Sequence, residues 1–319
     1  VLAGEYEFIA FPDGYIEPFT PGQQADIKYA VESGVSCFIT MGGDMAAPSH
    51  KAYPGWMSSV LYEFLPVTLT DNMKQTGSPF NIEVIKDDPA VLSIFVPLGI
   101  QKMVGSGFTY LYPRDGTTTW AKMFSTGLPR GAPGAWLVSW RTGTQGGLFW
   151  AVADDLDHLW WSPRDNDYGM DIFLNVMLYS TGRKLPEDIM LIHEIRNRYW
   201  TYNQERQLLY SLLEFVDRFG GNIRSLEDQI SGVDELKEES FDRYREQDYE
   251  GAWVAINEAQ EQIMVTATDA VELKDRALMW VYITEWSAVT GTMFVTGLVV
   301  HALLIKRWLY REVGTTRSR

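Results

Sequence analysis

A run of twenty residues near the C-terminal end contains almost no charge. Residues 286–305 read WSAVTGTMFVTGLVVHALLI, and only His301 among them can ionise. Twenty residues at about 1.5 Å each form a helix of roughly 30 Å, the thickness of the hydrocarbon core of a bilayer. The run is too long for a typical core helix of a soluble protein. The sequence therefore predicts one transmembrane helix, over residues 280–310.

Both flanks of this run carry the residues that membrane helices place at the two interfaces. Trp280, Tyr282 and Trp286 lie on one side, and Trp308 and Tyr310 lie on the other. Such aromatic belts are typical of the two headgroup regions.

The charges beside the run differ between its two ends. The basic residues after it are Lys306, Arg307, Arg311, Arg317 and Arg319, whereas the residues before it mix Glu272, Asp275 and Glu285 with Lys274 and Arg276. The positive-inside rule then places residues 311–319 in the cytoplasm and everything before residue 280 outside the cell. We expect a signal sequence to have preceded Val1.

Three positions inside the predicted membrane helix are polar or small enough to be of interest. Ser287 and Gly291 form a small-xxx-small pair, a weak signal for helix packing. His301 either faces a partner or a proton path, or reaches back to the nearby cytoplasmic interface, which its position favours.

Residues 184–279 are expected to form a helical stalk, as a hairpin or coiled coil. Apolar positions recur at helical spacing, and Gly220-Gly221-Asn222 is a stop signal. A second helix is expected from Ser225, where SLED has the pattern of a capping box. Residues 249–251 are expected to break it, and a third helix is expected to continue from Ala252 into the membrane. The apolar positions are Ile189, Ile192, Ile195, Tyr199, Leu208, Leu209, Leu212, Leu213 and Val216 in the first helix, and Val254, Ile256, Ala259, Ile263 and Val265 in the third.

Residues 1–183 are predicted to fold as an α/β domain. YEFIAF (residues 6–11) indicates a strand, residues 21–33 an amphipathic helix closed by Gly34, and VSCFITM (residues 35–41) a buried strand. AWLVSW and LFWAVA (residues 135–140 and 148–153) indicate a hairpin-like pair, and a helix is expected over residues 171–179. This order favours a flavodoxin-like parallel sheet with helices on both faces.

Several stretches of this domain resemble class I glutamine-amidotransferase-like domains, in particular the ThuA-like and membrane-attached members. The stretches are TPGQQADIKYAVESGVSCFITMGGDMA, LYEFLPV and AWLVSWRTGTQGGLFWAVADDLDHLWW. The resemblance covers residues 5–183 in pieces, and it implies the family fold, with the family's first strand missing or lying before Val1. In this family an acidic residue and a Trp follow the last strand, as Asp154, Asp155 and Trp161 do here.

The sequence lacks the nucleophile that amidotransferase chemistry needs. That chemistry uses a Cys at a tight strand-to-helix turn, usually Gly-x-Cys-x-Gly. Cys37 is the one cysteine of the chain, lies inside a predicted strand and has no glycine beside it, so we expect an inert thiol. There is no Gly-x-Ser-x-Gly turn either.

An Asp-rich loop is the best remaining candidate for a site. Ligands of open α/β sheets bind beyond the carboxyl ends of the strands, so we expect a pocket there. Its candidate residues are Asp44, His50, Asp154, Asp155, Asp157, His158 and Trp161. Asp154, Asp155 and His158 could hold a divalent cation, although no cofactor is required and Asp residues also cap turns. Trp160 and Trp161 could stack on a sugar or a partner, although core packing is the simpler interpretation.

These observations lead to two hypotheses. In the first, the chain is a non-catalytic amidotransferase-like subunit outside the cell, anchored in the cell membrane and working in a complex with other membrane or cell-surface proteins. In the second, it is a membrane-tethered hydrolase or carbohydrate-active enzyme that uses the Asp-rich loop. Nucleic acid is excluded as a partner, because the net charge of −15 opposes phosphate binding.

Overall fold

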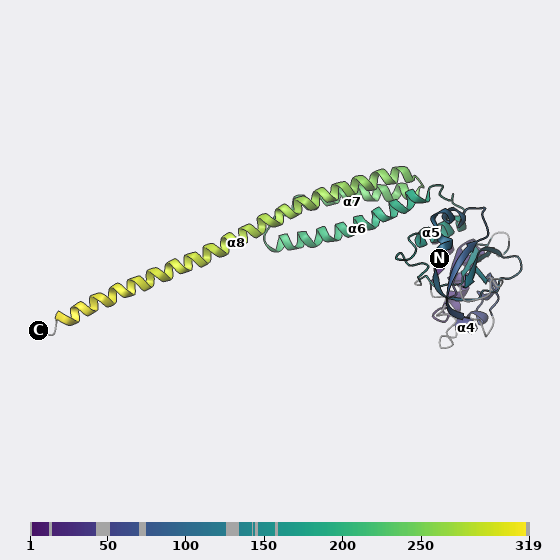
Figure 1. Cartoon of the computed structure of the whole chain (residues 1–319), viewed down its shortest axis with the longest axis horizontal. Helices are drawn as coiled ribbons and strands as arrows, with labels where there is room; N and C mark the ends of the chain where they lie inside the picture. Colours follow the sequence, from purple (N-terminus) through teal and green to yellow (C-terminus); the bar gives the residue numbers. More distant parts are fainter. Residues whose placement is uncertain are drawn as a thin grey trace. The chain divides into compact units, whose positions relative to one another are not determined.

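The computed structural model describes residues 2–12, 15–42, 52–69, 75–125, 134–141, 143, 146–156 and 159–316. The chain divides into two compact units, Val1–His193 and Glu194–Arg319. The first is an α/β domain and the second is made of long helices (Figure 1). The division falls inside helix α6 (Ile189–Arg218).

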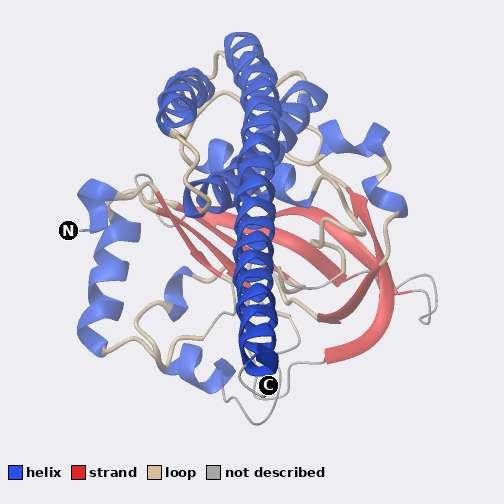
Figure 2. Cartoon of the chain, turned by 90° about the vertical axis from the view of Figure 1, so that its left-hand side faces the viewer, coloured by secondary structure: helices blue, strands red, loops and turns tan. Residues whose placement is uncertain are grey.

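The domain is built on one sheet of seven strands (Figure 2). The strands are β1 (Phe8–Phe11), β2 (Ser36–Thr40), β3 (Gln75–Val84), β4 (Gly105–Thr109), β5 (Thr118–Ser125), β6 (Gly134–Arg141) and β7 (Leu148–Val152). Their order across the sheet is β1-β2-β7-β6-β5-β3-β4. The helical segments are α1 (Leu2–Glu5), α2 (Pro21–Glu32), α4 (Ala52–Ser58), α5 (Gly169–Ser180) and the 3-10 turns η1 (Tyr62–Phe64), η2 (Ser93–Leu98) and η3 (Ile100–Lys102).

The sheet is mixed, so the prediction of a parallel sheet is right for one half only. β1, β2 and β7 pair in parallel, whereas β6, β5, β3 and β4 continue the sheet in antiparallel pairs. A parallel pair needs a crossover such as α2, which joins β1 to β2. The described connections between β3 and β7 contain no α-helix, and such connections produce antiparallel neighbours. The predicted pairing of β6 with β7 is confirmed.

Local sequence signals explain the predicted elements that the structure contains. Thr20 caps α2 in a capping box with Gln23, and Pro21 occupies the first turn. The side chain of Thr20 accepts a hydrogen bond from the Gln23 N–H, and the Gln23 side chain accepts one from the Thr20 N–H. All five residues of β2 are buried, as its unbroken apolar pattern predicts.

Helix α5 packs on one face of the sheet through aromatic side chains. Phe173 contacts Phe8 and Phe38 edge to face, with ring centroids 5.9 and 5.2 Å apart. Near the end of the helix, the Trp150 indole N–H donates to the Ser180 hydroxyl at 2.7 Å. These contacts bury large apolar surfaces, which is the main favourable contribution to folding.

The second unit is a three-helix bundle from which one helix continues alone (Figure 1). The helices are α6, α7 (Arg224–Arg245) and α8 (Tyr249–Thr316). Its core is formed by Tyr202, Leu209, Leu213, Leu226, Ile230, Val233, Ile256, Ala259, Ile263 and Ala270. The predicted helical stalk is therefore a bundle that closes on itself.

Some details of the stalk differ from the prediction. The residue before α7 is Ile223, which makes no side-chain cap hydrogen bond, so SLED does not form a capping box. The break before α8 lies around Gln247, whose φ is 65°, and Gly251 is inside the helix. Leu208, Val254 and Val265 follow the apolar periodicity but are exposed, because a three-helix bundle covers only one side of each helix.

Candidate functional site

The carboxyl ends of β2 and β7 meet at one edge of the sheet. Thr40 pairs with Val152 in the parallel register, so the residues that follow each strand lie together. The Gly42 N–H donates to Asp155 Oδ1 at 2.9 Å. A Cβ on Gly42 would lie 2.3 Å from Asp155 Cγ, so only glycine allows the carboxylate this close.

Both aspartates of this edge are buried and bonded to the backbone. Asp154 is 0% exposed and Asp155 3%. Asp154 Oδ1 accepts from the Asp155 N–H at 3.0 Å, and the Thr109 hydroxyl donates to the Gly42 carbonyl at 3.3 Å. A buried carboxylate is tolerated when hydrogen bonds replace its water, and these bonds join the ends of β2, β4 and β7.

The structure brings together only part of the predicted pocket. Asp154 and Asp155 lie at the expected edge, but Asp44, His50, Asp157 and His158 fall outside the described residues. Within the described ranges, no three His, Cys, Asp or Glu side chains are arranged to hold a metal ion. The cation set Asp154, Asp155 and His158 stays a prediction, because His158 is not among those residues.

Trp161 belongs to a buried aromatic cluster beside this edge. Its ring stacks on Trp136 with centroids 5.6 Å apart, and Trp160 contacts Trp136 at 4.4 Å. Trp160 and Trp161 are 0% and 5% exposed. Core packing is therefore their role here. The register between β5 and β6 shifts at Trp136, which no residue of β5 opposes, and such a bulge redirects a side chain.

Cys37 lies in the core on β2. It is fully buried, and burial raises the pKa of its thiol to about 12. Because the thiolate is the nucleophile, almost none of the reactive form exists near neutral pH. The expectation of an inert thiol agrees with this geometry.

Buried Asp171 pairs with the partly buried His193, and no motif in the sequence marks this pair. Asp171 Oδ2 lies 2.9 Å from His193 Nδ1, and Tyr168 packs on the imidazole with ring centroids 4.9 Å apart. Asp171 is 1% exposed at the start of α5. One feature of the sequence could have indicated this pair: Asp171 is the one carboxylate in the apolar helix α5. A carboxylate buried on such a helix needs a hydrogen-bond partner from another element.

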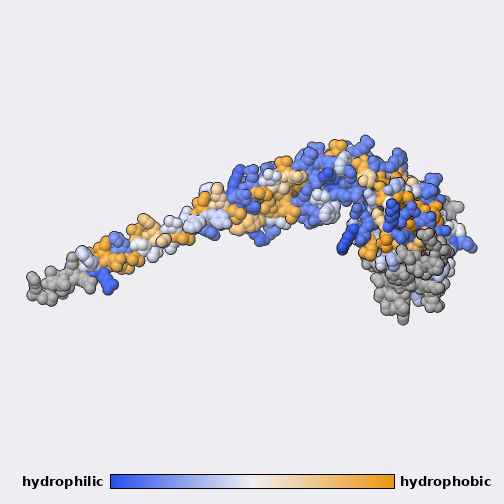
Figure 3. All heavy atoms as spheres, in the orientation of Figure 1, coloured by the Kyte–Doolittle hydropathy of each residue, from blue (hydrophilic) through white to orange (hydrophobic). Residues whose placement is uncertain are grey.

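From Tyr282 to Tyr310, the side chains of α8 are exposed and predominantly apolar. One helix among the described residues is long and apolar enough to cross a membrane, and its most apolar window is entirely exposed. Trp286, Gly291, His301, Lys306 and Arg307 all lie on this exposed part. Figure 3 shows the apolar spheres gathered along this part of the chain.

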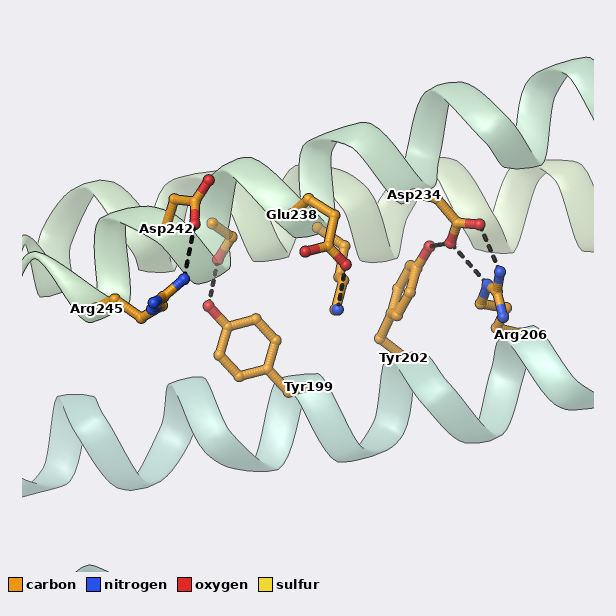
Figure 4. A network of polar contacts seen from close by, with 9 residues as sticks. Tyr199, Tyr202, Arg206, Asp234, Glu238, Asp242 and Arg245 are labelled. Atoms are coloured by element: carbon orange, nitrogen blue, oxygen red, sulfur yellow. Dashed lines mark hydrogen bonds and ion pairs between the residues drawn. The ribbon is translucent and has the colours of Figure 1, made fainter. Parts of the chain in front are cut away.

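A polar network joins α6 to α7 in the bundle (Figure 4). Arg206 binds both oxygens of Asp234, with Nε–Oδ1 and Nη2–Oδ2 distances of 2.7 and 2.6 Å, and the Tyr202 hydroxyl donates to Asp234 Oδ1 at 2.8 Å. Partial burial pushes the pKa of Asp234 upward, but the hydrogen bonds from Arg206 and Tyr202 outweigh it and lower the pKa overall. Farther along, the Arg198 Nη1 donates to Gln260 Oε1 at 2.6 Å. These contacts join α6 to α7 and α8.

Comparison with known proteins identifies no family for this chain. No protein-family model matches it, and no curated protein matches it. Among solved structures it is similar to the cytoplasmic protein STM1381 from Salmonella typhimurium LT2, with 18% sequence identity and a TM-score of 0.41. That match covers 55% of this chain and 72% of the other. The likeness is distant, and no function follows from it.

Proposed function

We propose that the chain is a non-catalytic, membrane-anchored subunit that binds or assembles with other proteins outside the cytoplasm. The observation that carries this proposal is the continuity of α8. Its first part packs in the bundle, and its later part exposes apolar side chains along its length. A helix that is apolar all round needs a lipid or protein surround.

The dimensions of this part of α8 fit a bilayer. Trp286 and Trp308 are 22 residues apart, which is about 33 Å along a helix. Both rings are exposed, and Trp280, Tyr282 and Tyr310 extend the two aromatic groups. Indole and phenol rings are favoured at the headgroup level, so one belt lies at each interface.

The orientation rests on the charges at the two ends. Lys306 and Arg307 follow the apolar segment, whereas Asp275 and Glu285 lie before or near its start. By the positive-inside rule the C-terminal end lies in the cytoplasm, and the domain and bundle lie on the other side.

The domain is, on this proposal, amidotransferase-like in ancestry but without amidotransferase chemistry. The stretches of sequence that resemble the family, which run from α2 through the β6–β7 pair, support this ancestry. The burial of Cys37 and its raised pKa support the absence of thiol catalysis. The backbone hydrogen bonds that Asp154 and Asp155 accept support a structural role for these carboxylates.

Cysteine labelling in intact cells tests the membrane topology. Cys37 is the single cysteine and is buried, so the natural chain is an unreactive background. We expect an impermeant maleimide to label Val265→Cys, on the exposed side of the bundle, in intact cells. A cysteine added after Arg319 should react only after permeabilisation. The reverse pattern, or release of the chain from membranes by alkaline carbonate, contradicts the proposal.

Purification with neighbouring proteins tests the binding role. The full chain is extracted in mild detergent, and co-purifying proteins are identified by mass spectrometry. Asp154→Asn and Asp155→Asn should retain the same partners. If either folded variant instead abolishes a hydrolytic activity of the wild-type chain, the non-catalytic interpretation is wrong.

A further inference from the structure

Helix α6 presents a second apolar face, opposite to the one in the bundle core. Trp200, Leu208 and Phe215 are 67%, 71% and 37% exposed, whereas Leu209 and Leu213 are buried. At about 100° per residue, the three exposed side chains lie within about 80° of arc on the side away from the core. We call the line formed by Trp200, Gln204, Leu208, Ser211 and Phe215 the α6 seam.

The spacing of the α6 seam suits contact with a second long helix. Its residues follow one another at intervals of 4, 4, 3 and 4. A 4-4-3 repeat has about 3.67 residues per turn, close to the 3.6 of a straight helix. Two such helices can therefore meet along four turns with only a slight twist, which leaves the bundle undistorted.

The charge pattern separates this face from the rest of the bundle. All seven exposed residues of α6 between Arg198 and Glu214 are uncharged: Trp200, Asn203, Gln204, Gln207, Leu208, Tyr210 and Ser211. On α7 most exposed residues are charged, among them Glu227, Asp228 and Glu235. On the bundle part of α8, Glu258 and Glu261 are exposed. In a chain of net charge −15, the α6 seam is a face free of repulsion between copies.

We propose that the α6 seam binds the α6 seam of a second copy of this chain. In a two-fold interface each residue near the axis meets its own counterpart, so a charge there would face a like charge. Gln204 and Ser211, which lie between the apolar residues, each carry a donor and an acceptor and can bond to their own copies. Trp and Phe are among the residue types enriched at protein interfaces.

The arrangement of the two copies follows from the membrane, and this step rests on the proposed function. Two copies anchored with one orientation can share only a two-fold axis along the membrane normal, so their α6 helices run parallel. Gln204 then faces Gln204, and Ser211 faces Ser211. Dimerisation of the bundle also brings the two α8 helices into one region of the bilayer.

Disulfide cross-linking of the full chain in its native membranes tests the pairing. Ser211→Cys and Gln204→Cys should each form a covalent dimer under mild oxidation. Ser231→Cys, at an exposed position of α7, is the matched control and should give several-fold less. An antiparallel pair centred between Gln207 and Leu208 would instead cross-link a mixture of the two variants, and that result overturns the proposed arrangement.

A charge placed in the α6 seam tests the interface without disturbing the fold. Ser211→Glu sets like charges against each other only in the dimer, so it should weaken association about tenfold or more in detergent, as followed by analytical ultracentrifugation. Ser231→Glu should leave association unchanged. Equal behaviour of the two variants overturns the proposal, as does a Ser211→Cys chain that cross-links only to a different protein.

Carbonate extraction of the same membranes distinguishes a failure of the proposed membrane anchor from a failure of the proposed dimer. A chain released by carbonate contradicts the proposed membrane anchor. A chain retained in the membrane but not cross-linked through Ser211→Cys contradicts the dimer alone.

Discussion

The two parts of α8 have the same backbone but different surroundings. In residues 249–277, Ile256 and Ile263 are buried in the bundle, and Glu258 and Glu261 face outward. In residues 278–310, Met293 and Leu298 are exposed on different sides of the helix. An amphipathic helix needs a protein on one side and water on the other. A uniformly apolar helix needs a solvent that is itself apolar, so one helix joins two environments.

Charges placed in the two parts should give the largest difference. Val295→Arg with Leu298→Arg puts two guanidinium groups near the bilayer centre, at about 2.5–3.5 kcal/mol each on insertion scales. We expect loss of stable insertion, measured as release by alkaline carbonate. Val254→Arg with Val265→Arg, at exposed positions of the bundle part, is the matched control and should stay in the membrane. If both variants insert stably, the two parts of α8 do not differ in their surroundings as proposed.

Truncation of one isoleucine in each part should give the next largest effect. Ile263→Ala leaves a cavity in the bundle core and should destabilise the bundle by about 2–5 kcal/mol. Ile305→Ala should cost much less, because Ile305 is half exposed and lipid chains can fill the space. Hydrogen–deuterium exchange of α6 and α7 amides measures the difference. Faster exchange in Ile305→Ala than in Ile263→Ala would contradict it.

Acid should loosen the bundle but leave the anchor in place. The pKa of Asp234 is lower in the folded chain than its unfolded value near 3.9, so its stabilisation is complete above that value. It is lost as the pH falls through the lower folded pKa. Asp234→Asn should remove this acid dependence and about 1 kcal/mol of stability, a small figure because the Arg206–Asp234 pair is partly exposed.

Thermal unfolding of the bundle between pH 2 and pH 6 measures this effect. Asp228→Asn changes an exposed carboxylate of the same helix and serves as the control. If the two variants have the same pH profile, Asp234 does not contribute through its ion pair.

Part of the candidate site and of the helical unit can be predicted from sequence because the signals are local. Thr20 and Gln23 cap α2, the unbroken apolar run marks β2, and Gly220 follows the end of α6. The position of Asp154 and Asp155 follows from a strand that ends just before them. Each of these inferences needs only neighbouring residues.

The antiparallel half of the sheet could not be predicted in the same way. β3 contains Gly77, Ser78 and Pro79, which weaken a strand signal, and its partners in β4 and β5 are more than twenty residues away. Pairing between distant segments depends on which surfaces can be buried together. The Asp171–His193 pair could not be predicted for the same reason, because its two residues lie on different helices, α5 and α6, that only the fold brings together.

The sequence alone determines that α8 has an apolar segment of bilayer length, because composition and length are local properties. It also determines that Cys37 is the one thiol of the chain. Only the tertiary structure decides which apolar residues of α6 and α8 are covered, since a helix has several sides and the bundle buries one. Leu208 and Leu209 are adjacent leucines, and only packing makes one a core residue and the other part of an exposed seam.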